Sequence, residues 1–476
     1  MSRLTEVCSY AIIAVISIRK EKQIISQHNK SAQHNHGRGF TIVELLVVIF
    51  VIGILAVITI VAYNGIQQRA NVAALKIDMS GAAKTLELAN TTAGTYPATL
   101  TAAALKSSPG TTYQYTYASS SNSYCLTGTN NGISYTASTA SPTPSVGVCP
   151  GYNGGVVATL AGSGTSGFAE GSGSSAMFNY PFGITVDASG TLYVADSNNN
   201  RVRKVTAAGV VSTLAGSGTY GFVEGTGASA QFRGPYGVAV DTSGTVYVAD
   251  RGNHKIRKIT AAGVVSTLAG SGTAGYLDGT GTTAQFNFPS GVTVDASGSV
   301  YVADSNNNRI RVITTAGVVS TLAGSGAFGF ADGIGTGAQF NGPGGVAVDS
   351  SGNVYVADQT NHRVRKITTA GVVSTLAGSG TPSFADGTGT AAQFYNPFSV
   401  TVDGSGNVYV ADTGNQRIRK ITASGVVTTF AGTGTQGFSD GPGASAQFNN
   451  PFGVTVDSVG NIYVADRDNN LVRKIQ

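Results

Sequence analysis

The pattern of hydrophobic and polar residues in the last two thirds of the chain repeats every 54 residues. Each copy holds four short β-type runs separated by turn residues; in the second copy they begin at Gly237, Thr245, Lys255 and Val264. Four strands per unit and six units predict an all-β six-bladed β-propeller over residues 151–476. The string YVAD marks the copies, starting at Tyr193, Tyr247, Tyr301, Tyr355, Tyr409 and Tyr463.

The two ends of the repeat array are incomplete in complementary ways. The array begins with a fourth strand, Val156 to Gly162, that no earlier unit precedes, and it ends with a third strand, Leu471 to Ile475, that no fourth strand follows. Pairing of these two strands completes the sixth blade and removes both open sheet edges. We therefore expect a closed ring rather than an open solenoid, which needs polar capping repeats.

A continuous apolar run precedes the repeats. It extends from Phe40 to Tyr63 with a single charged residue, Glu44, and basic residues lie directly upstream. The run is long enough for one tilted membrane-spanning helix. Helical spacing of Ala and apolar residues continues to about Asn90. We therefore expect one long helix, ended near Pro97.

Short β-like runs follow this helix. They cover residues 113–117, 123–126 and 133–136, which is enough for a small sheet. The stretch 136–147 is rich in Ser, Thr and Pro and is expected to be a loop. Residues 40–150 are therefore predicted to form an α+β unit that precedes the propeller.

The fourth repeat reads DSSGNVYVADQTNHRVRKI from Asp349 to Ile367. It resembles the NHL family, whose consensus is D-x-x-G-N-x-Y-V-A-D-x-x-N-H-R-I-R-K. The signature His occurs at His254 and His362, and Leu471 replaces the basic residue in the last copy. NHL propellers are mostly binding platforms, with lyases and hydrolases among their relatives, so the resemblance implies a fold more firmly than an activity.

The segment RGFTIVELLVVIFVIGILAVITIVAYNGIQ, from Arg38 to Gln67, resembles the start of a type IV prepilin. The resemblance implies that residues 1–39 are a leader, that a prepilin peptidase cleaves between Gly39 and Phe40, and that the new terminus is N-methylated. It also implies that Glu44 pairs with the terminal amine of a neighbouring pilin subunit, because opposite charges compensate one another in low dielectric. A simple signal anchor needs only the basic flank and the apolar run, and does not explain Glu44.

The same resemblance bears on the cysteines. Cys8 lies in the predicted leader, so the mature chain keeps Cys125 and Cys149, which flank the last β run of the pilin-like head. Families of this type often close a C-terminal loop with a disulfide, which implies a Cys125–Cys149 bridge in an oxidising exterior. Two free, buried thiols are the alternative.

The net charge of +5 comes mostly from the leader, which holds six Lys or Arg residues and two Glu residues. The propeller holds 19 basic and 19 acidic residues, so its net charge is zero. Nucleic-acid binding needs a basic face. We therefore expect no nucleic-acid partner.

Acidic residues recur at two positions of every repeat. A ring of carboxylates could hold a cation on the axis, but a residue present in every blade serves what every blade needs, such as binding loop amides or pairing with the repeated R-x-R-K run. The two positions are Asp196, Asp250, Asp304, Asp358, Asp412 and Asp466 after the second strand, and Glu170, Glu224, Asp278, Asp332, Asp386 and Asp440 in the long loops.

The sequence offers few candidate catalytic residues. His254 and His362 are too few for a catalytic zinc site, the sequence has no G-x-S-x-G motif, and the six inner strands are nearly identical. We expect no catalytic residue, metal or cofactor, and therefore no enzyme. A calcium-dependent hydrolase, for which axial Asp or Asn ligands suffice, is the enzymatic alternative.

One position departs from the six-fold symmetry. The residue after the proline that precedes each inner strand is aromatic in four contiguous copies, with Ser290 and Gly344 in the other two. We expect the aromatic residues to ring one mouth of the central channel as a crescent facing a gap. Exposed aromatic residues suit sugar or peptide recognition; the alternative is that they close the channel as core. The predicted ligand-binding residues are Phe182, Tyr236, Phe398 and Phe452, with Tyr180, Phe288 and Tyr395 nearby.

These features predict a surface-displayed, pilin-like protein, either a minor or tip pilin or a pseudopilin, whose propeller is a binding or adhesion module. A single N-terminal helix holds it in the cytoplasmic membrane, with the propeller outside, and processing places it on a pilus or the cell surface. The expected partners are the prepilin peptidase and methylase, other pilin subunits, the membrane, and an extracellular glycan or protein. The alternative is a membrane-tethered extracellular hydrolase or lyase of the six-bladed propeller class.

Overall fold

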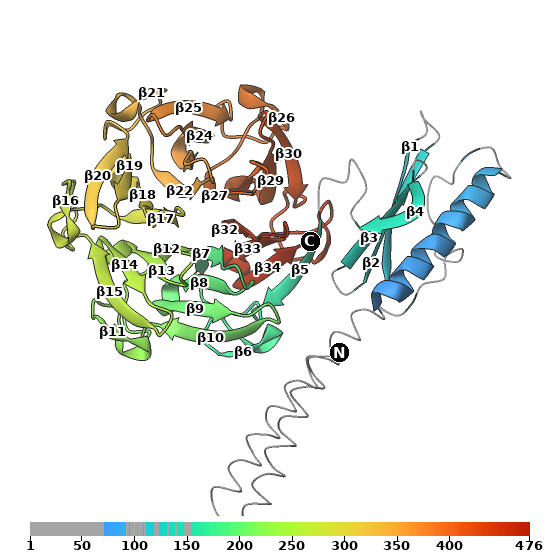
Figure 1. Cartoon of the computed structure of the whole chain (residues 1–476), viewed down its shortest axis with the longest axis horizontal. Helices are drawn as coiled ribbons and strands as arrows, with labels where there is room; N and C mark the ends of the chain where they lie inside the picture. The colour runs from blue at the N-terminus through green and yellow to red at the C-terminus, as the bar shows by residue number, and fades with distance from the viewer. Residues whose placement is uncertain are drawn as a thin grey trace, which may run out of the picture. The chain divides into compact units, whose positions relative to one another are not determined.

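The computed structural model describes residues 71–91, 95, 108, 111–118, 123–130, 133–138, 141–146 and 155–476. Residues 155–476 form six β-sheets arranged around a central axis (Figure 1). Residues 71–91 form a helix, and residues 112–146 contribute a separate four-stranded sheet.

Blade 1 shows the construction of all six blades. Its strands run antiparallel from the channel outwards in the order β7, β8, β9, β10, with the two-residue β6 at the outer edge. Consecutive strands are joined by short turns, and the 3-10 helix η2 connects β8 to β9. The bounds are β6 (Gly171–Ser172), β7 (Pro181–Val186), β8 (Leu192–Asp196), β9 (Arg201–Val205) and β10 (Val210–Ala215), with η1 (Gly173–Ser175) and η2 (Ser197–Asn199).

Blades 2 to 6 repeat this order. Blade 2 has β11 (Gly225–Thr226), η3 (Gly227–Ser229), β12 (Pro235–Val240), β13 (Val246–Asp250), η4 (Arg251–Asn253), β14 (Lys255–Ile259) and β15 (Val264–Ala269). Blade 3 has β16 (Gly279–Thr280), η5 (Gly281–Thr283), β17 (Pro289–Val294), β18 (Val300–Asp304), η6 (Ser305–Asn307), β19 (Arg309–Ile313) and β20 (Val318–Ala323). Blade 4 has β21 (Gly333–Ile334), η7 (Gly335–Gly337), β22 (Pro343–Val348), β23 (Val354–Asp358), η8 (Gln359–Asn361), β24 (Arg363–Ile367) and β25 (Val372–Ala377). Blade 5 has β26 (Gly387–Thr388), η9 (Gly389–Ala391), β27 (Pro397–Val402), β28 (Val408–Asp412), η10 (Thr413–Asn415), β29 (Arg417–Ile421) and β30 (Val426–Ala431). Blade 6 has β31 (Gly441–Pro442), β32 (Pro451–Val456), β33 (Ile462–Asp466), η11 (Arg467–Asn469) and β34 (Leu471–Ile475), completed by β5 (Val156–Ala161).

The two ends of the array close the ring, as the sequence predicts. Strand β5 pairs antiparallel with β34, with Ala161 opposite Val472 and Val157 opposite Ile475. The outer edge of β5 is covered in turn by β31, where Gly441 faces Val157. The sixth blade is therefore built from both ends of the propeller, and no long strand is left with an open edge at the junction.

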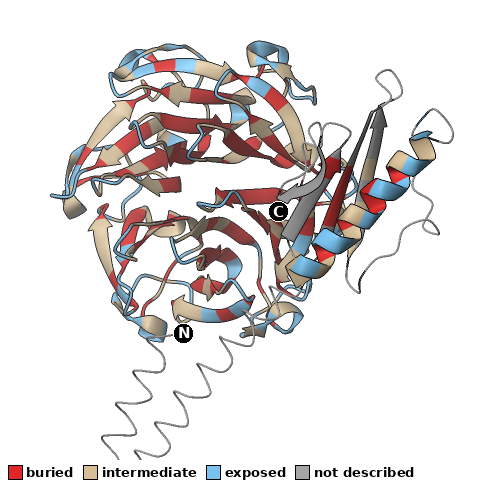
Figure 2. Ribbon diagram, turned by 45° about the vertical axis from the view of Figure 1, so that its right-hand side comes forward, coloured by how far each residue is buried: buried red, intermediate tan, exposed pale blue. Residues whose placement is uncertain are grey.

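The hydrophobic core lies between neighbouring blades. Buried residues follow the strands, while exposed residues gather on the turns and loops (Figure 2). One phenylalanine per blade, from the loop before the inner strand, is fully buried between sheets. Because every interface uses the same residue type at the same position, six equivalent clusters replace one central core. These phenylalanines are Phe178, Phe232, Phe286, Phe340, Phe394 and Phe448.

A buried ion pair fixes the second and third strands of each blade. In blade 1 the Asp196 carboxylate accepts hydrogen bonds from Arg203 at 2.8 Å, from the Asn199 amide at 2.9 Å and from the Asn179 backbone N–H at 2.8 Å. Both charged side chains are fully buried. The same Arg–Asp pair occurs in all six blades at 2.7–3.0 Å. The structural role predicted for the Asp residues at the ends of the second strands and for the R-x-R-K run is therefore confirmed.

The smaller unit packs one helix against an antiparallel sheet with the order β1-β2-β3-β4. The buried side chains of residues 71–91 are Leu75, Met79, Ala82, Ala83 and Leu86, which lie on one helical face, as their spacing predicts. A Cβ placed on Gly128 would lie 2.3 Å from the Met79 sulfur, so the helix approaches the sheet closely at this glycine. The strands are β1 (Thr112–Ala118), β2 (Ser123–Asn130), β3 (Ile133–Ser138) and β4 (Ser141–Val146).

Strand β4 corrects the loop predicted over residues 136–147. Its sequence contains Pro142 and Pro144, which lack the N–H that a central strand needs. β4 pairs only with β3 and lies at the edge of the sheet, where alternate N–H positions face away from the neighbouring strand. Prolines two residues apart are compatible with such an edge strand.

Several predictions fall outside the described part of the chain. They include the leader and its cleavage site, Gly39 and Phe40, the apolar run from Phe40 to Tyr63 with Glu44, and Cys149 with the side chain of Cys125. In the part that is described, no helix is both long and apolar enough to span a membrane.

Candidate functional site

One mouth of the channel is formed by two kinds of segment from each blade. The first is the loop before the inner strand, and the second is the 3-10 helix after the second strand. In blade 1 the two are joined by the Asn198 N–H, which donates to the Asn179 carbonyl at 3.1 Å. The four aromatic residues that break the six-fold symmetry lie here, and we call Phe182, Tyr236, Phe398 and Phe452 the aromatic cap.

The rings of the aromatic cap contact one another in a closed circuit. Phe182 stacks on Tyr236 with ring centroids 4.0 Å apart and meets Phe452 edge-on at 4.8 Å. Phe398 lies 4.3 Å from Phe452 and 6.1 Å from Tyr236. Phe182 and Phe452 are only 8% exposed. The open crescent expected from the sequence is therefore a compact cluster, because rings at the narrow end of a channel bury more apolar surface by packing together.

The two non-aromatic positions make room for this cluster. Ser290 is buried, and Gly344 is buried beside Phe398. A Cβ on Gly344 would lie 2.6 Å from the Phe398 carbonyl oxygen and 3.3 Å from its ring. Small residues in blades 3 and 4 thus allow rings from the other blades to cover the axis. Burial raises the pKa of the Tyr236 hydroxyl within the cap.

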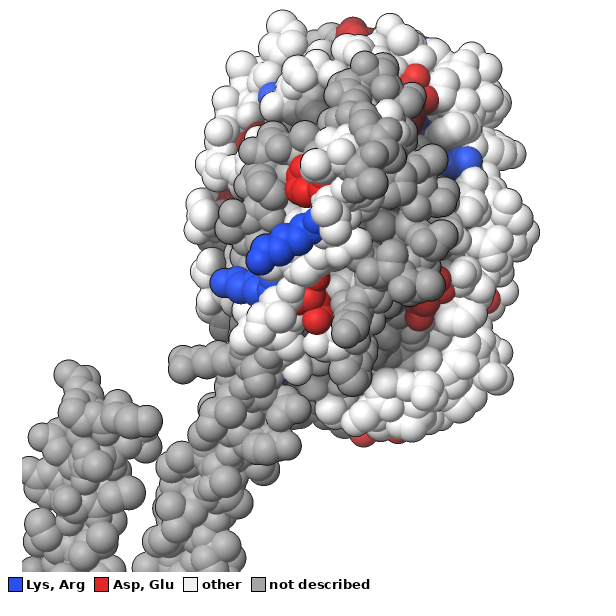
Figure 3. All heavy atoms as spheres, turned by 90° about the vertical axis from the view of Figure 1, so that its right-hand side faces the viewer, with Lys and Arg blue, Asp and Glu red and all other residues white. Residues whose placement is uncertain are grey.

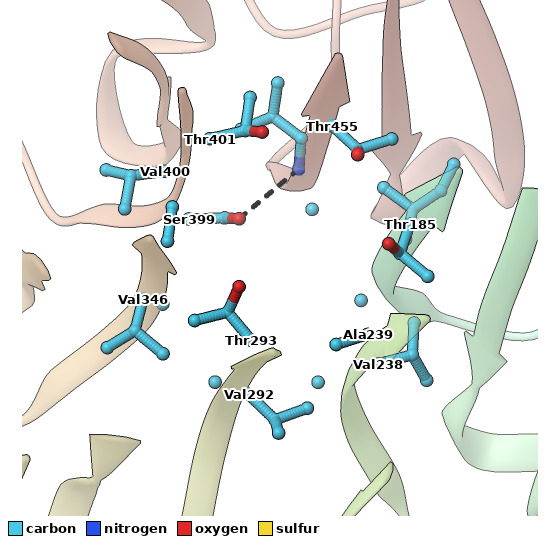
Figure 4. A pocket seen from close by; sticks show the side chains of 18 of the residues that line it. Thr185, Val238, Ala239, Val292, Thr293, Val346, Ser399, Val400, Thr401 and Thr455 are labelled. Carbon is cyan, nitrogen blue, oxygen red and sulfur yellow. Dashed lines mark hydrogen bonds between the residues drawn. The ribbon is translucent and has the colours of Figure 1, made fainter. Parts of the chain in front are cut away.

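A small polar chamber lies beneath the cap. The hydroxyl groups of Thr185, Thr293, Thr401 and Thr455 point toward the axis (Figure 4). Ser399, which stands where the other blades have glycine, accepts a hydrogen bond from the Val454 N–H at 3.4 Å. The chamber measures about 90 Å³, far less than the roughly 300–1,000 Å³ of typical ligand pockets. The chamber itself is therefore too small for a ligand larger than a few waters.

Three further aromatic residues lie on the rim of the mouth, outside the cap. Tyr180 and Tyr395 are exposed, at 38% and 42%, and Phe288 is half-buried. Tyr180 and Phe288 have φ values of 53° and 50°, in the left-handed region, where the other blades have Gly or Asn. A bulky residue in this conformation is strained and is uncommon unless its side chain has a role.

Arginine residues are the part of the mouth that sequence analysis missed. Arg251 lies over the rings of Tyr236 and Phe288, with its guanidinium carbon 4.6 and 4.7 Å from their centroids. Arg467 lies 4.1 Å from the Phe452 ring and pairs with Asp468. No described hydrogen-bond acceptor serves the buried Arg251 Nε.

A signal for these arginines was present in the sequence. The residue after YVAD is a hydroxyl residue in blades 1, 3 and 5, and Arg251, Gln359 and Arg467 in blades 2, 4 and 6. Thr413 shows the hydroxyl role, since its Oγ1 donates to the Pro451 carbonyl of the next blade at 2.7 Å. Arg251 and Arg467 instead lie over rings at the mouth.

The signature histidines have a structural role. His254 and His362 accept hydrogen bonds through Nδ1 from the backbone N–H groups of Phe288 and Asn396 in the next blade, each at 3.1 Å. In blade 1 the Asn200 side chain accepts the equivalent bond at 3.0 Å. Burial and nearby arginine lower the pKa of both histidines, so the neutral form is favoured. Among the described residues, no group of three or more His, Cys, Asp or Glu side chains is arranged to hold a metal ion.

Two family models match this chain. The NHL repeat model matches residues 178–205, 232–259, 286–313, 340–367, 394–421 and 448–475. The model of the prokaryotic N-terminal methylation motif matches residues 34–60. The chain carries six NHL repeats behind a prepilin-type methylation motif. Each NHL match starts at the buried phenylalanine before the inner strand and ends with the third strand.

Relatives of the NHL propeller occur in much larger proteins. The protein SUPPRESSOR OF QUENCHING 1, chloroplastic, of Arabidopsis thaliana is 33% identical over 285 residues, and NHL repeat-containing protein 2 of Homo sapiens is 30% identical over 285 residues. These alignments cover 56% and 52% of this chain but 27% and 39% of the relatives. The chain therefore spans well under half of either relative.

Solved structures share the fold at low identity. An auxiliary nutrient binding protein from Bacteroides thetaiotaomicron superposes with a TM-score of 0.53 at 16% identity, over 74% of this chain and 94% of that one. A protein of unknown function from the same organism also gives a TM-score of 0.53, at 22% identity, over 74% and 81% of the two chains. At this level of identity the likeness shows the architecture alone.

Proposed function

We propose that this chain is a surface-displayed, pilin-like protein whose NHL propeller binds an acidic extracellular glycan at the aromatic mouth of its channel. The methylation motif supports processing by a prepilin peptidase and display through the N-terminal helix. The bulk of the propeller favours a minor or tip pilin, or a pseudopilin, over a major filament subunit.

The observation that carries the binding proposal is the composition of the rim. Tyr180 and Tyr395 are exposed aromatic residues, on whose rings sugars can stack, and the Arg467 guanidinium lies 5.6 Å from the Tyr180 ring centroid. Arg251, which lies over Tyr236 and Phe288, has no carboxylate paired to it among the described ion pairs. The cap itself supplies a rigid floor rather than a pocket, because its rings are packed against one another. Aromatic faces beside a guanidinium suit a sugar that bears a carboxylate.

Charge outside the mouth is mixed. On the described part of the face shown in Figure 3, basic and acidic side chains lie among one another. The cationic side chains placed at the mouth are Arg251 and Arg467, and Arg467 is offset by Asp468. This local excess favours an anionic ligand over a neutral one.

The alternative function is a membrane-tethered extracellular hydrolase or lyase. The residues that line the chamber beneath the cap are Thr, Ser, Gly, aliphatic and aromatic residues, with no carboxylate or imidazole among them. We therefore favour a binding protein without a catalytic residue, metal or cofactor.

The experiment is a binding screen of the propeller, residues 155–476, against glycans. The panel pairs uronic-acid-containing oligosaccharides with their neutral counterparts. We expect saturable binding of the acidic members. The variant Arg251→Gln, which carries the residue found at the equivalent Gln359 of blade 4, should weaken this binding. Equal binding of neutral and acidic members, or binding that Arg251→Gln leaves intact, contradicts the proposal. Binding of a protein but of no glycan would redirect it to a peptide ligand, and turnover of a panel member would favour the enzyme.

A further inference from the structure

The outer part of each blade contains a site for a cation, which is clearest in blade 1. Arg201 donates from Nη1 to the Asn199 carbonyl at 3.2 Å and from Nη2 to the Ser217 carbonyl at 2.7 Å. Its guanidinium carbon lies 3.8 Å above the centroid of the Phe168 ring. We call this space, bounded by one ring and two carbonyls, the outer cation site.

Blades 3, 4 and 5 repeat the geometry closely. The guanidinium-to-centroid distance is 3.7–3.8 Å, and the two hydrogen bonds measure 3.1–3.2 and 2.6–2.7 Å. In blade 2 the cation is Lys255, whose Nζ lies 4.7 Å from the Phe222 centroid and donates to the Gly270 carbonyl at 2.8 Å. The arginines of blades 3 to 5 are Arg309, Arg363 and Arg417.

Blade 6 has the site without its cation. Leu471 stands in place of the arginine and is buried. The ring that the cation would cover, Phe438, is 55% exposed, whereas its counterparts in the other blades are 39–44% exposed. The equivalent carbonyls belong to Asn469 and Ser163, and no hydrogen bond from a described residue reaches either of them.

Two measures show that the site is open. A Cβ on Gly218 would lie 2.3 Å from the Arg201 guanidinium, but at the equivalent Gly164 the nearest atom is the Asn469 carbonyl oxygen at 3.8 Å. A cavity of about 470 Å³ opens at this place, lined by Phe438, Asp440, Asp468 and Asn469 among others.

The charges of blade 6 are unbalanced in the same place. In blade 1 two carboxylates, Asp196 and Glu170, attract two cations, Arg203 and Arg201. In blade 6 Asp466 and Asp440 both bind Arg473, which is fully buried, and the second cation is missing. Asp468 does not change this balance, because it is paired with Arg467.

We propose that the open outer cation site of blade 6 binds the guanidinium of an arginine side chain presented by a partner polypeptide. The planar guanidinium stacks on Phe438 and donates to the Asn469 and Ser163 carbonyls, as its counterparts do in four other blades. Lysine is a poorer ligand, because an ammonium group cannot stack on the ring and reach both carbonyls at once. None of the residues that line this cavity belongs to the aromatic cap or to the rim aromatic residues, although Asp468 pairs with Arg467 of the mouth.

The test uses the purified full-length chain and N-acetyl-L-arginine methylamide as the probe, followed by ligand-observed NMR. We expect saturable binding at one site, with the corresponding lysine and citrulline amides binding more weakly. Leu471→Arg fills the site from within, as in blades 1, 3, 4 and 5, and should weaken probe binding about tenfold or more without lowering the melting temperature. Arg417→Leu is the matched variant, because it should open a second site under Phe384 and raise the stoichiometry to two.

The proposal is overturned if the wild-type chain shows no saturable binding at millimolar probe, if citrulline amide binds as well as arginine amide, or if Leu471→Arg binds the probe as tightly as the wild type. Unchanged stoichiometry in a folded Arg417→Leu variant also contradicts it. Leu471→Arg should leave glycan binding at the mouth unchanged, so failure of one site does not imply failure of the other.

Discussion

At the scale of single residues, the positions that matter are those where the blades differ from one another. Tyr180 is the clearest case, because it holds a left-handed backbone conformation, with φ 53°, where Asn396 and Asn450 have nearly the same conformation at 49° and 51°. The backbone of blade 1 does not need a tyrosine there. Its side chain is exposed, so burial of apolar surface does not offset the backbone strain.

Tyr180→Asn should therefore stabilise the propeller. Relief of the left-handed strain should raise the free energy of unfolding by about 1 kcal/mol. Chemical denaturation of the wild type and the variant measures the change, and Tyr395→Asn, outside the left-handed region, is the control. A loss of stability in Tyr180→Asn would show that the ring packs as core.

The histidines give a pH dependence with a defined sign. The pKa of His254 and His362 is lowered in the folded chain by burial and nearby arginine, below the value of about 6.5 in the unfolded chain. Their stabilising contribution is therefore present above about pH 6.5 and is lost as the pH falls, since the unfolded chain then binds more protons. Protonation at Nδ1 also removes the acceptor for the next blade.

The double variant His254→Asn/His362→Asn should remove this pH dependence. Asn already accepts the equivalent bond in blade 1, from the Gly234 N–H at 3.0 Å. Between pH 7.5 and 5.5, the melting temperature of the wild type should fall more than that of the variant, whose carboxylates are identical. Parallel melting curves for the two proteins would contradict the assignment.

At the scale of elements, the sequence predicts well what the repeat controls. The four long strands of each blade and the pairing of β5 with β34 follow from strand length, alternation and the complementary ends of the array. The two-residue outer strands, such as β6, were missed because two residues carry no hydrophobic period. β4 was missed because proline counts against a strand unless its edge position is known.

Deletion of β5 tests the closure. A chain that starts at Ser163 leaves the backbone of β34 unpaired on one side and removes Val157 and Ala161 from the core. We expect aggregation or a large fall in the melting temperature. A chain that starts at Gly155, and so keeps β5, should melt like the propeller in the full chain. If both shortened chains melt alike, the ring does not depend on this strand.

At the scale of the whole molecule, a prepilin-type methylation motif precedes six NHL repeats. The position of the aromatic residues at the mouth was predictable from their loop, but their mutual packing was not, because it depends on distances across the axis between blades far apart in sequence. Arg251 and Arg467 could have been predicted from the residue after YVAD, which alternates between a hydroxyl residue and Arg or Gln from blade to blade.

The N-terminal methylation motif predicts how the chain is processed. With the methylation motif at residues 34–60, mass spectrometry of the protein from its native host should find an N-methylated Phe40 at the mature terminus. Glu44→Ala should leave cleavage intact and impair assembly, because it removes only the charge partner of the terminal amine. An intact leader would leave a simple membrane anchor in place of a pilin-like segment.

The central claim is that the rim of the mouth binds an acidic glycan while the cap supports it. Calorimetric titration with the best acidic oligosaccharide tests it most directly, comparing the wild type, Tyr180→Asn/Tyr395→Asn and Phe452→Ser. We predict that the rim variant loses affinity, about 1–3 kcal/mol per stacking residue, without loss of stability, while Phe452→Ser lowers stability by roughly 3–5 kcal/mol as expected for a buried ring. Unchanged affinity in the rim variant would contradict the account.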